Sequence, residues 1–271
     1  MNLKHLQDIC ATVRRDIITM IGKANSGHPG GSLSLVEILV SLYYEVMNIK
    51  PEDPQWEDRD RLVLSKGHGC PALYSVLAHR GYFEKDKLIT LRKLGSILQG
   101  HPDMKKTPGI DASTGSLGQG LSVAAGMALG AKLKNKNYKI FCIIGDGEMQ
   151  EGQIWEAMMA SIHYKLDNLT IILDHNRLQI DGPNDAVMSL GHITERMKAF
   201  GFDVCEVDGH DIEALINTFC RPSSQGKPKF VIANTVKGKG VSFMENQVGW
   251  HGKTPNAEEV KKALIELGGE I

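Results

Sequence analysis

The chain has 271 residues, 42% of them hydrophobic and 23% charged, which is enough to bury the core of one α/β domain. Its 31 basic and 32 acidic residues give a net charge of −1, which argues against nucleic acid or an anionic membrane surface as a partner. The five cysteines form no C-x-x-C pair, and no apolar run approaches the roughly twenty residues that cross a bilayer. We therefore expect a cytoplasmic protein with a small ligand and no disulfide framework.

The first half of the chain is predicted to alternate helices with loops marked by glycine and proline. In chain order we expect a helix at 3–24, a loop at 25–34, a helix at 35–48, a strand at 61–65, a helix at 71–80, a loop at 95–116 and a helix at 121–133. Loop 25–34, NSGHPGGSLS, is expected to have no regular structure. A loop as long as 95–116 in a compact α/β domain is more often functional than idle.

The second half is predicted to alternate strands and helices. The expected strands are 139–144, 169–173, 203–207 and 229–235, and the expected helices are 151–164, 192–200, 211–219 and 256–267. The run from Lys139 to Asn176 is one βαβ unit, whose right-handed crossover makes its two strands parallel. The pattern predicts a single three-layer α/β/α domain with a mostly parallel sheet.

Polar residues follow the two central strands at the point where each ends. Gly145-Asp146-Gly147 follows KIFCII, and Asn176 follows LTIIL. The carboxyl ends of parallel strands meet at one edge, so Asp146 and Asn176 are expected to face one point. Mg²⁺ prefers such hard oxygens, and glycines let the backbone approach a phosphate. A lone Gly-Asp-Gly also occurs in ordinary turns, so its strand and helix context is what favours a metal and diphosphate site.

Four histidines lie in loops marked by glycine or proline. They are His28, His68, His101 and His251. Any one of them alone is more often a surface residue or a local hydrogen-bond partner, and their spacing is not that of a zinc site. Together, imidazoles suit chemistry on sugar phosphates, because they bind hydroxyls and exchange protons near neutral pH.

Other polar residues have two open interpretations. GSLGQG at 115–120 precedes a helix and serves either a close backbone crossing or a ligand. Lys66 and Lys237 lie beside glycine-rich turns, where they could serve phosphate or proton transfer, although a loop lysine is usually only solvated. Glu151 and Glu156 begin a helix, whose positive end acids stabilise in any case.

The segment from Gly145 to Asn176 resembles the thiamine diphosphate signature, which opens with Gly-Asp-Gly and ends in Asn about thirty residues later. The ordered set SGHPG, SKGHG, GHPD and GSLGQG resembles the transketolase family. The resemblance implies Mg²⁺, with Ca²⁺ or Mn²⁺ as substitutes, bound by Asp146, Asn176 and the carbonyl of Leu178. The residues it implies for thiamine diphosphate are His68, Gly115, Ser116, Leu117, Gly147, Asn176 and His251.

The resemblance also implies roles in catalysis. His28 and His101 would contact substrate hydroxyls, and His251 would touch both diphosphate and substrate. Glu151, with Glu156, would lie at an interface between paired sites, where Glu151 meets the catalytic glutamate of a partner domain. The chain departs from the family in two places. His175 stands where many relatives have a first Asn, and Ser116 stands where several have Pro.

Residues 1–271 resemble only the diphosphate-binding domain of transketolase; the pyrimidine and carboxyl-terminal domains are expected on a separate polypeptide. This implies the N-terminal subunit of a split transketolase, a heterotetramer with two copies of each subunit. It would transfer a two-carbon ketol unit between sugar phosphates, pentose phosphates by default. Alternatives are the alpha subunit of a 2-oxoacid dehydrogenase, a 1-deoxyxylulose-5-phosphate synthase relative, or a noncatalytic remnant of the fold. No P-loop motif supports a kinase.

Overall fold

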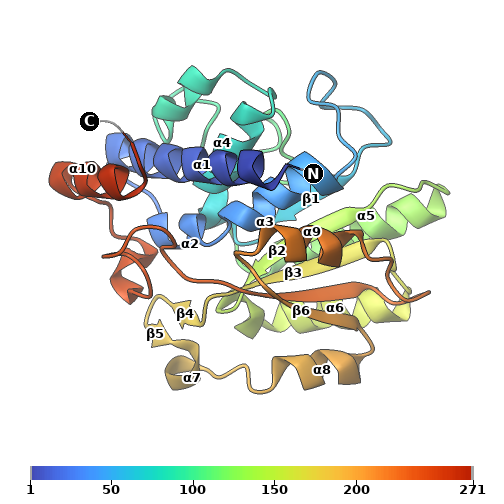
Figure 1. The fold of residues 1–271 in the computed structure, drawn as a ribbon. Helices are drawn as coiled ribbons and strands as arrows, with labels where there is room; N and C mark the ends of the chain where they lie inside the picture. Colours follow the sequence, from blue (N-terminus) through green and yellow to red (C-terminus); the bar gives the residue numbers. More distant parts are fainter. Residues whose placement is uncertain (1, 270–271) are drawn as a thin grey trace.

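A five-stranded parallel sheet organises the chain in the computed structural model, which describes residues 2–269 (Figure 1). Its strands, in spatial order, are β1 (Arg61–Leu64), β2 (Ile140–Gly145), β3 (Leu169–His175), β7 (Lys229–Asn234) and β6 (Asp203–Asp208). Every neighbouring pair is parallel. Strands that are buried on both faces consist of continuous apolar runs, and β2 and β3 could therefore be predicted from the sequence.

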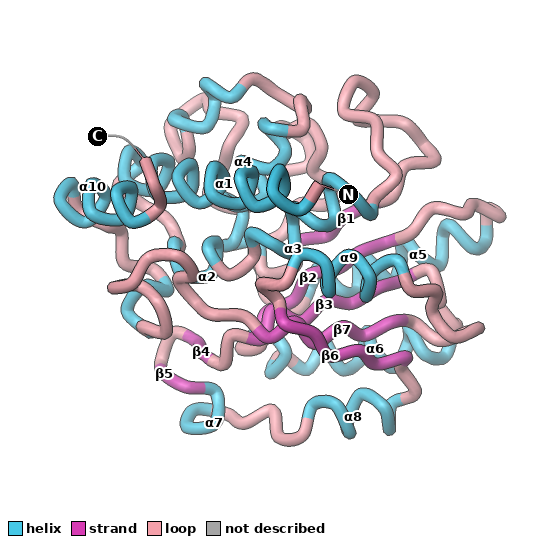
Figure 2. The backbone as a smooth tube through the Cα atoms, in the orientation of Figure 1, coloured by secondary structure: helices cyan, strands magenta, loops and turns pink. Residues whose placement is uncertain are grey.

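Helices cover both faces of this sheet (Figure 2). The helices that share the first core are α1 (Leu3–Ala24), α3 (Val36–Ser41), α4 (Cys70–His79), α9 (Ile212–Cys220) and α10 (Ala257–Glu266). Those that share the second core are α5 (Gln119–Leu133), α6 (Gly152–His163) and α8 (Ile193–Phe200). The predicted three-layer α/β/α architecture is therefore confirmed.

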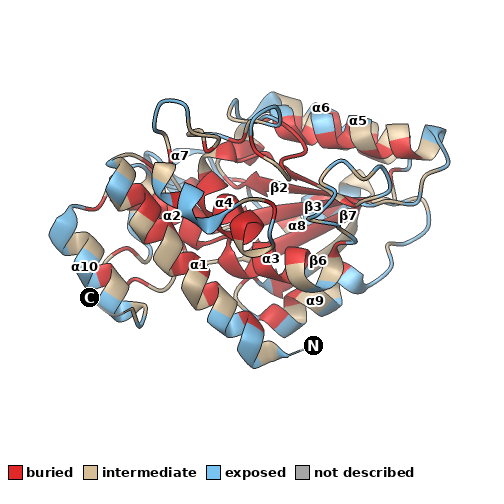
Figure 3. Cartoon of the chain, turned by 90° about the horizontal axis from the view of Figure 1, so that it is seen from above, coloured by how far each residue is buried: buried red, intermediate tan, exposed pale blue. Residues whose placement is uncertain are grey.

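The pleat of each strand divides its side chains between the two cores. In β2, Phe141 and Ile143 pack into the first core, whereas Ile140, Cys142 and Ile144 pack into the second. The central strands β2, β3 and β7 are accordingly buried between the helices (Figure 3), whereas the edge strand β6 is partly exposed. Such a sheet leaves the carboxyl edge of its strands as the place where loops and a ligand can meet.

Two predictions about local structure were wrong. Loop 25–34 contains a fully buried five-residue helix, α2 (Pro29–Leu33), which begins with proline at a position where a missing N–H costs nothing. The helix expected at 35–48 divides into α3 and a π-helical turn, η1 (Leu42–Val46). Loop 95–116 has neither helix nor strand, as predicted.

The sequence analysis also missed several short elements. These are a hairpin of β4 (Leu178–Gln179) and β5 (Gly182–Pro183), the helix α7 (Asn184–Val187), and the single turns η2 (Gly67–Gly69), η3 (Lys85–Thr90), η4 (Glu148–Gln150) and η5 (Val248–His251). Three of them, η2, η4 and the hairpin, directly follow the carboxyl ends of β1, β2 and β3. They shape the edge at which the predicted site residues lie.

All five cysteines are free thiols. Within residues 2–269, none of the helices combines the length and apolar character that crossing a membrane requires. The expected domain bounds of 1–271 include Met1 and residues 270–271, which lie outside the described residues.

Candidate active site

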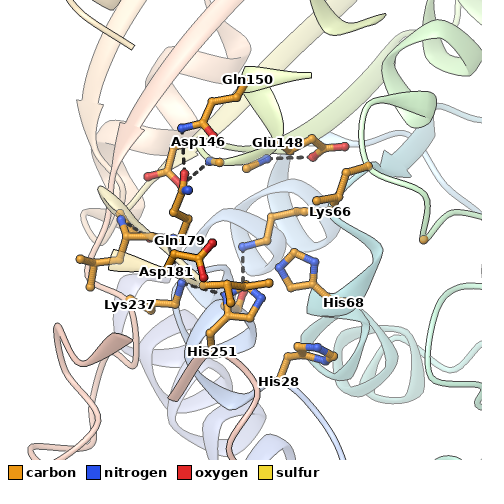
Figure 4. Close-up of a pocket in the computed structure, with 18 of the residues that line it drawn as sticks. His28, Lys66, His68, Asp146, Glu148, Gln150, Gln179, Asp181, Lys237 and His251 are labelled. Carbon is orange, nitrogen blue, oxygen red and sulfur yellow. Dashed lines mark hydrogen bonds between the residues drawn. The ribbon is translucent and has the colours of Figure 1, made fainter. Parts of the chain in front are cut away.

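The two predicted strand ends meet in the folded chain. Gly145 of β2 is paired with Asp174 of β3, so Asp146 and Asn176 follow adjacent strands at the same edge. Both line a pocket of about 300 Å³ (Figure 4). The other lining residues are His28, Gly31, Lys66, His68, His101, Gly115, Leu117, Gly145, Gly147, Glu148, Gln150, Leu178, Gln179, Ile180, Asp181, Lys237 and His251.

Asp146 is 3% exposed, and two backbone N–H groups hold its carboxylate in place. The N–H of Gly147 donates to Oδ1 at 2.9 Å, and the N–H of Arg177 donates to Oδ2. Burial, and next the charge of Asp174, raise the pKa of Asp146 above its usual value. A bound cation would favour the charged form and offset this penalty.

Asn176 and Leu178 supply the other two oxygens of the predicted metal site. The Asn176 amide oxygen accepts one hydrogen bond, from the Leu178 N–H at 3.2 Å. The Leu178 carbonyl accepts one from the Lys237 ammonium at 2.9 Å. Each oxygen therefore keeps a lone pair, as Mg²⁺ coordination with few protein ligands requires. Among residues 2–269 no group of three or more His, Cys, Asp or Glu side chains is arranged to hold a metal ion.

Lys237 joins the metal side of the pocket to its histidines. Its Nζ lies 3.1 Å from Nδ1 of His251, and the residue is 2% exposed. Burial, with the nearby charge of Lys66, lowers the pKa of Lys237 to about 8. An ammonium has no acceptor, so Nδ1 of His251 accepts this hydrogen bond.

Lys66 lines the pocket and forms an ion pair with the buried Asp174. Their side chains are 2% and 0% exposed, and Lys66 also donates to the carbonyl of Gly31 at 3.1 Å. Ser34 and Thr235 add hydroxyl donors to Asp174. Burial alone would raise the pKa of Asp174, but the charge and hydrogen bond of Lys66 hold it below its usual value. The interpretation of Lys66 and Lys237 as solvated loop lysines is therefore wrong.

The four loop histidines all line this pocket. Figure 4 shows three of them, His28, His68 and His251, close together on one side of it. The ring centroid of His28 lies 5.3 Å from that of His68, 5.6 Å from His251 and 6.4 Å from His101. The rings of His68 and His251 are 5.1 Å apart. His28, His68 and His251 are partly buried, and His101 is exposed but lies in the same group, so these histidines are not separate surface residues.

Burial keeps these imidazoles neutral near pH 7. Desolvation, followed by the charge of Arg92, lowers the pKa of His28 to about 4. Desolvation and Lys237 lower the pKa of His251 to about 3. The pKa of His68 and that of His101 are lowered as well, chiefly by burial. A neutral ring offers one donor and one acceptor, which suits a polyhydroxylated ligand.

Glu148, which the sequence analysis missed, ties the two glycine loops together. Its Oε1 accepts hydrogen bonds from the Ser65 hydroxyl and from the N–H of Gly118 at 2.9 Å. Its Oε2 accepts from the N–H of Gly145 at 3.0 Å. The GSLGQG loop is thereby fixed against the Gly-Asp-Gly turn.

The remaining predicted residues divide between the pocket and the surface. Gly115 and Leu117 line the pocket, and a Cβ at Gly115 would lie 3.2 Å from the His101 ring. Ser116 is exposed and does not line it. Glu151 is exposed at the start of α6, with Glu156 exposed one turn further along.

His175 does not line the pocket that contains the three predicted metal ligands. Its Nδ1 lies 3.1 Å from Oδ1 of Asn234, and it lines a neighbouring pocket. The departure from the family pattern at this position therefore leaves the oxygen set untouched.

Several pocket residues were not anticipated from the sequence. Gln179, Ile180 and Asp181 come from the β4–β5 hairpin, and Gln150 donates to Gln179 at 2.7 Å. The available signal was Asp181-Gly182, a pair that favours tight turns. It places a hairpin directly after Asn176.

Comparison with known proteins finds one family along nearly the whole chain. A family model described as "Transketolase, thiamine diphosphate binding domain" matches residues 6–270. The 6-deoxy-6-sulfo-D-fructose transketolase subunit of a Clostridium strain is 45% identical, over 98% of this chain and 97% of that protein. An apulose-4-phosphate transketolase subunit of Phocaeicola vulgatus is also 45% identical, over 95% of this chain and 92% of that protein.

Longer transketolases match along part of their length. The human enzyme is 40% identical over 99% of this chain and 43% of its own. The crystal structure of Campylobacter jejuni transketolase superposes with a TM-score of 0.94 at 36% identity, covering all of this chain and 44% of that one. The chain thus spans less than half of these enzymes. It belongs to the transketolase family of transferases, within which it corresponds to the thiamine diphosphate-binding domain.

Proposed function

We propose that this chain is the diphosphate-binding subunit of a two-subunit transketolase. The complex transfers a two-carbon ketol unit from a ketose phosphate to an aldose phosphate, using thiamine diphosphate and Mg²⁺. The proposal rests on one observation: a single pocket contains the three oxygens that could bind the metal and four histidines that are neutral near pH 7. Two relatives named as transketolase subunits match over nearly their whole length, which supports the division into two polypeptides.

The oxygens and glycines of the pocket fit the diphosphate end of the cofactor. Asp146, Asn176 and the Leu178 carbonyl would hold the divalent cation. The cofactor contacts would come from the pocket residues His68, Gly115, Leu117, Gly147, Asn176 and His251, and from Ser116, which is exposed between Gly115 and Leu117. When bound, thiamine diphosphate supplies the electron sink for cleaving and forming the carbon–carbon bond.

The histidines would orient the sugar. His28 and His101 are neutral near pH 7, so each offers one donor and one acceptor to substrate hydroxyls. His251 faces Lys237 with Nδ1, which leaves Nε2 to meet diphosphate or substrate. These contacts position the reacting carbons, which is the main catalytic contribution open to groups with so low a pKa.

The pyrimidine end of the cofactor would be held by a separately encoded partner subunit. Exposed Glu151 would face the catalytic glutamate of that partner, with Glu156 beside it, in a heterotetramer of two copies of each subunit. Such a complex would be cytoplasmic, in keeping with the five free thiols.

The test is reconstitution. This chain and the candidate partner are purified separately and assayed, alone and mixed, for ketol transfer between pentose phosphates with Mg²⁺ and thiamine diphosphate. We expect activity only in the mixture. Ketol transfer by the isolated chain would contradict the division into subunits, and a mixture active only with pyruvate as donor would favour a 2-oxoacid dehydrogenase or a synthase relative.

A further inference from the structure

A buried polar cluster outside the pocket joins three parts of the chain to a fourth, the segment 235–241. Arg14 comes from α1, Glu37 from α3 and His210 from the loop between β6 and α9, and their side chains are 9%, 8% and 13% exposed. Glu37 lies between the other two. Arg14 Nη2 lies 2.6 Å from Oε1 of Glu37, and His210 Nδ1 lies 2.9 Å from Oε2.

Both partners of Glu37 reach onward to the glycine-rich segment 235–241, which follows β7. The N–H of Val236 donates to Nε2 of His210 at 2.8 Å. On the other side, Nε of Arg14 donates to the carbonyl of Lys239 at 3.0 Å. These two hydrogen bonds bracket Lys237, and both originate from side chains that Glu37 holds.

The segment is shaped to fit this cluster. Gly240 has a φ of +95°, and a Cβ at that position would lie 2.9 Å from Cδ of Arg14. Gly238, with a φ of +80°, would bring a Cβ within 2.3 Å of the Met244 carbonyl oxygen. Only glycine allows the backbone to pass so close while remaining in this conformation.

The hydrogen bonds of His210 define its protonation. Because Nε2 accepts from the Val236 N–H, the ring proton must lie on Nδ1, which then donates to Glu37. Burial alone would raise the pKa of Glu37, but His210 and Arg14 hold it below its usual value. The carboxylate therefore stays charged and fixes both the tautomer and the direction of the ring.

We propose that Glu37 and His210 are positioning residues of the active site, which act through Val236 to hold the Lys237 ammonium against the Leu178 carbonyl and His251. The backbone hydrogen bond places Val236, and the next residue carries the ammonium that contacts both groups. The assignment of the Leu178 carbonyl as a Mg²⁺ ligand rests on the proposed function. The positioning of the 235–241 segment by Glu37 and His210 does not rest on it.

The first test compares two substitutions at one position. In His210→Gln the amide oxygen can replace Nε2 as acceptor of the Val236 N–H, whereas in His210→Asn the shorter side chain can replace only Nδ1. We expect hydrogen exchange at the Val236 amide of the purified chain to be at least about tenfold faster in His210→Asn than in His210→Gln. Equal exchange in the two variants would overturn the proposal, whatever the function of the protein.

The second test asks whether the cluster acts through Lys237. The two-subunit complex is titrated with thiamine diphosphate and Mg²⁺, and binding is followed by tryptophan fluorescence, since Trp250 adjoins His251. We expect Glu37→Gln to weaken binding about fivefold or more when Lys237 is present and less than about twofold in a Lys237→Met background. The pair His210→Asn and His210→Gln is measured in both backgrounds too, in case Glu37→Gln does not fold.

The outcomes separate positioning from general stabilisation. A group that only stabilises the fold would weaken binding equally in both backgrounds, and that result would overturn the proposal. If the complex binds no thiamine diphosphate at all, the proposed function fails, and the exchange test at Val236 still decides the positioning role within the chain.

Discussion

The ammonium of Lys66 lies 2.5 Å from Oδ2 of Asp174 under the candidate site, and neither side chain is more than 2% exposed. The pair joins the turn after β1 to the end of β3, 108 residues later in the chain. Burial and the charge of Asp174 raise the pKa of Asp146, and the charge of Lys66 acts in the opposite direction. Lys66 therefore offsets part of the negative charge that these two buried carboxylates place near the pocket.

Replacing Lys66 by Met is expected to destabilise the chain strongly. The substitution leaves the Asp174 carboxylate buried without its cation, which lowers the free energy of unfolding by about 3–5 kcal/mol. Urea denaturation of the purified chain measures the effect. The double variant Lys66→Met with Asp174→Asn removes the stranded charge and should recover more than about 1 kcal/mol. A single variant within about 1 kcal/mol of the unaltered chain would contradict this account.

Replacing Asp146 by Asn tests the metal assignment at nearly constant volume. The predicted site has one carboxylate among its three protein ligands, so losing that charge should weaken Mg²⁺-dependent binding of thiamine diphosphate by more than about tenfold. Binding is measured by calorimetry in the two-subunit complex. Asp181→Asn is the matched control, because Asp181 lines the same pocket outside the predicted ligand set. Similar losses in both variants would rule out the specific role of Asp146.

Features that depend on neighbouring residues could be predicted from the sequence, whereas contacts between residues far apart in the chain could not. The strands were readable because β2 and β3 are continuous apolar runs, and the meeting of Asp146 with Asn176 follows from parallel strand order alone. Local patterns gave no sign of the bonds from Glu148 to Ser65 or from Lys66 to Asp174, whose partners lie 83 and 108 residues apart. Those contacts exist only after the sheet has formed.

The errors in local structure have a similar origin. Residues 25–34 are rich in glycine, serine and proline, which favours a loop, yet α2 forms there because tertiary packing buries all five of its residues. The same burial converts four ordinary loop histidines into neighbours with a lowered pKa. Composition alone predicts that such residues are exposed, whereas packing partly buries His28, His68 and His251 and leaves only His101 exposed among the four.

The lowered pKa of His28 predicts that the folded chain loses stability in mild acid. The pKa of His28 falls from 6.5 to about 4 on folding, so between these values the unfolded chain binds more protons than the folded one. The free energy of unfolding should therefore fall as the pH is lowered from 6.5 towards 4. Urea denaturation at several pH values should show a shallower fall in His28→Gln than in the unaltered chain.

A surface histidine provides the control for this pH dependence. His5 is exposed on α1, far along the chain from the loops of the pocket, and His5→Gln should leave the fall unchanged. Buried carboxylates such as Asp146, whose pKa is raised by burial, act in the opposite direction, so the comparison between variants isolates the histidine. The same slope in His28→Gln and the unaltered chain would show that this histidine is protonated as readily folded as unfolded.

Glu151 separates a role at the partner interface from a role within the fold. It is exposed at the N-cap of α6 and lines no part of the pocket, so Glu151→Gln should change the free energy of unfolding of the isolated chain by less than about 0.5 kcal/mol. In the two-subunit complex, where Glu151 would meet the glutamate of the partner, we expect ketol transfer to fall by about tenfold or more.

Glu258→Gln, in the exposed first turn of α10, removes the same charge from a helix start and should leave both quantities unaltered. An equal loss of activity in the two variants would assign the effect of Glu151 to its helix end, and a full retention of activity in Glu151→Gln would remove it from the catalytic interface.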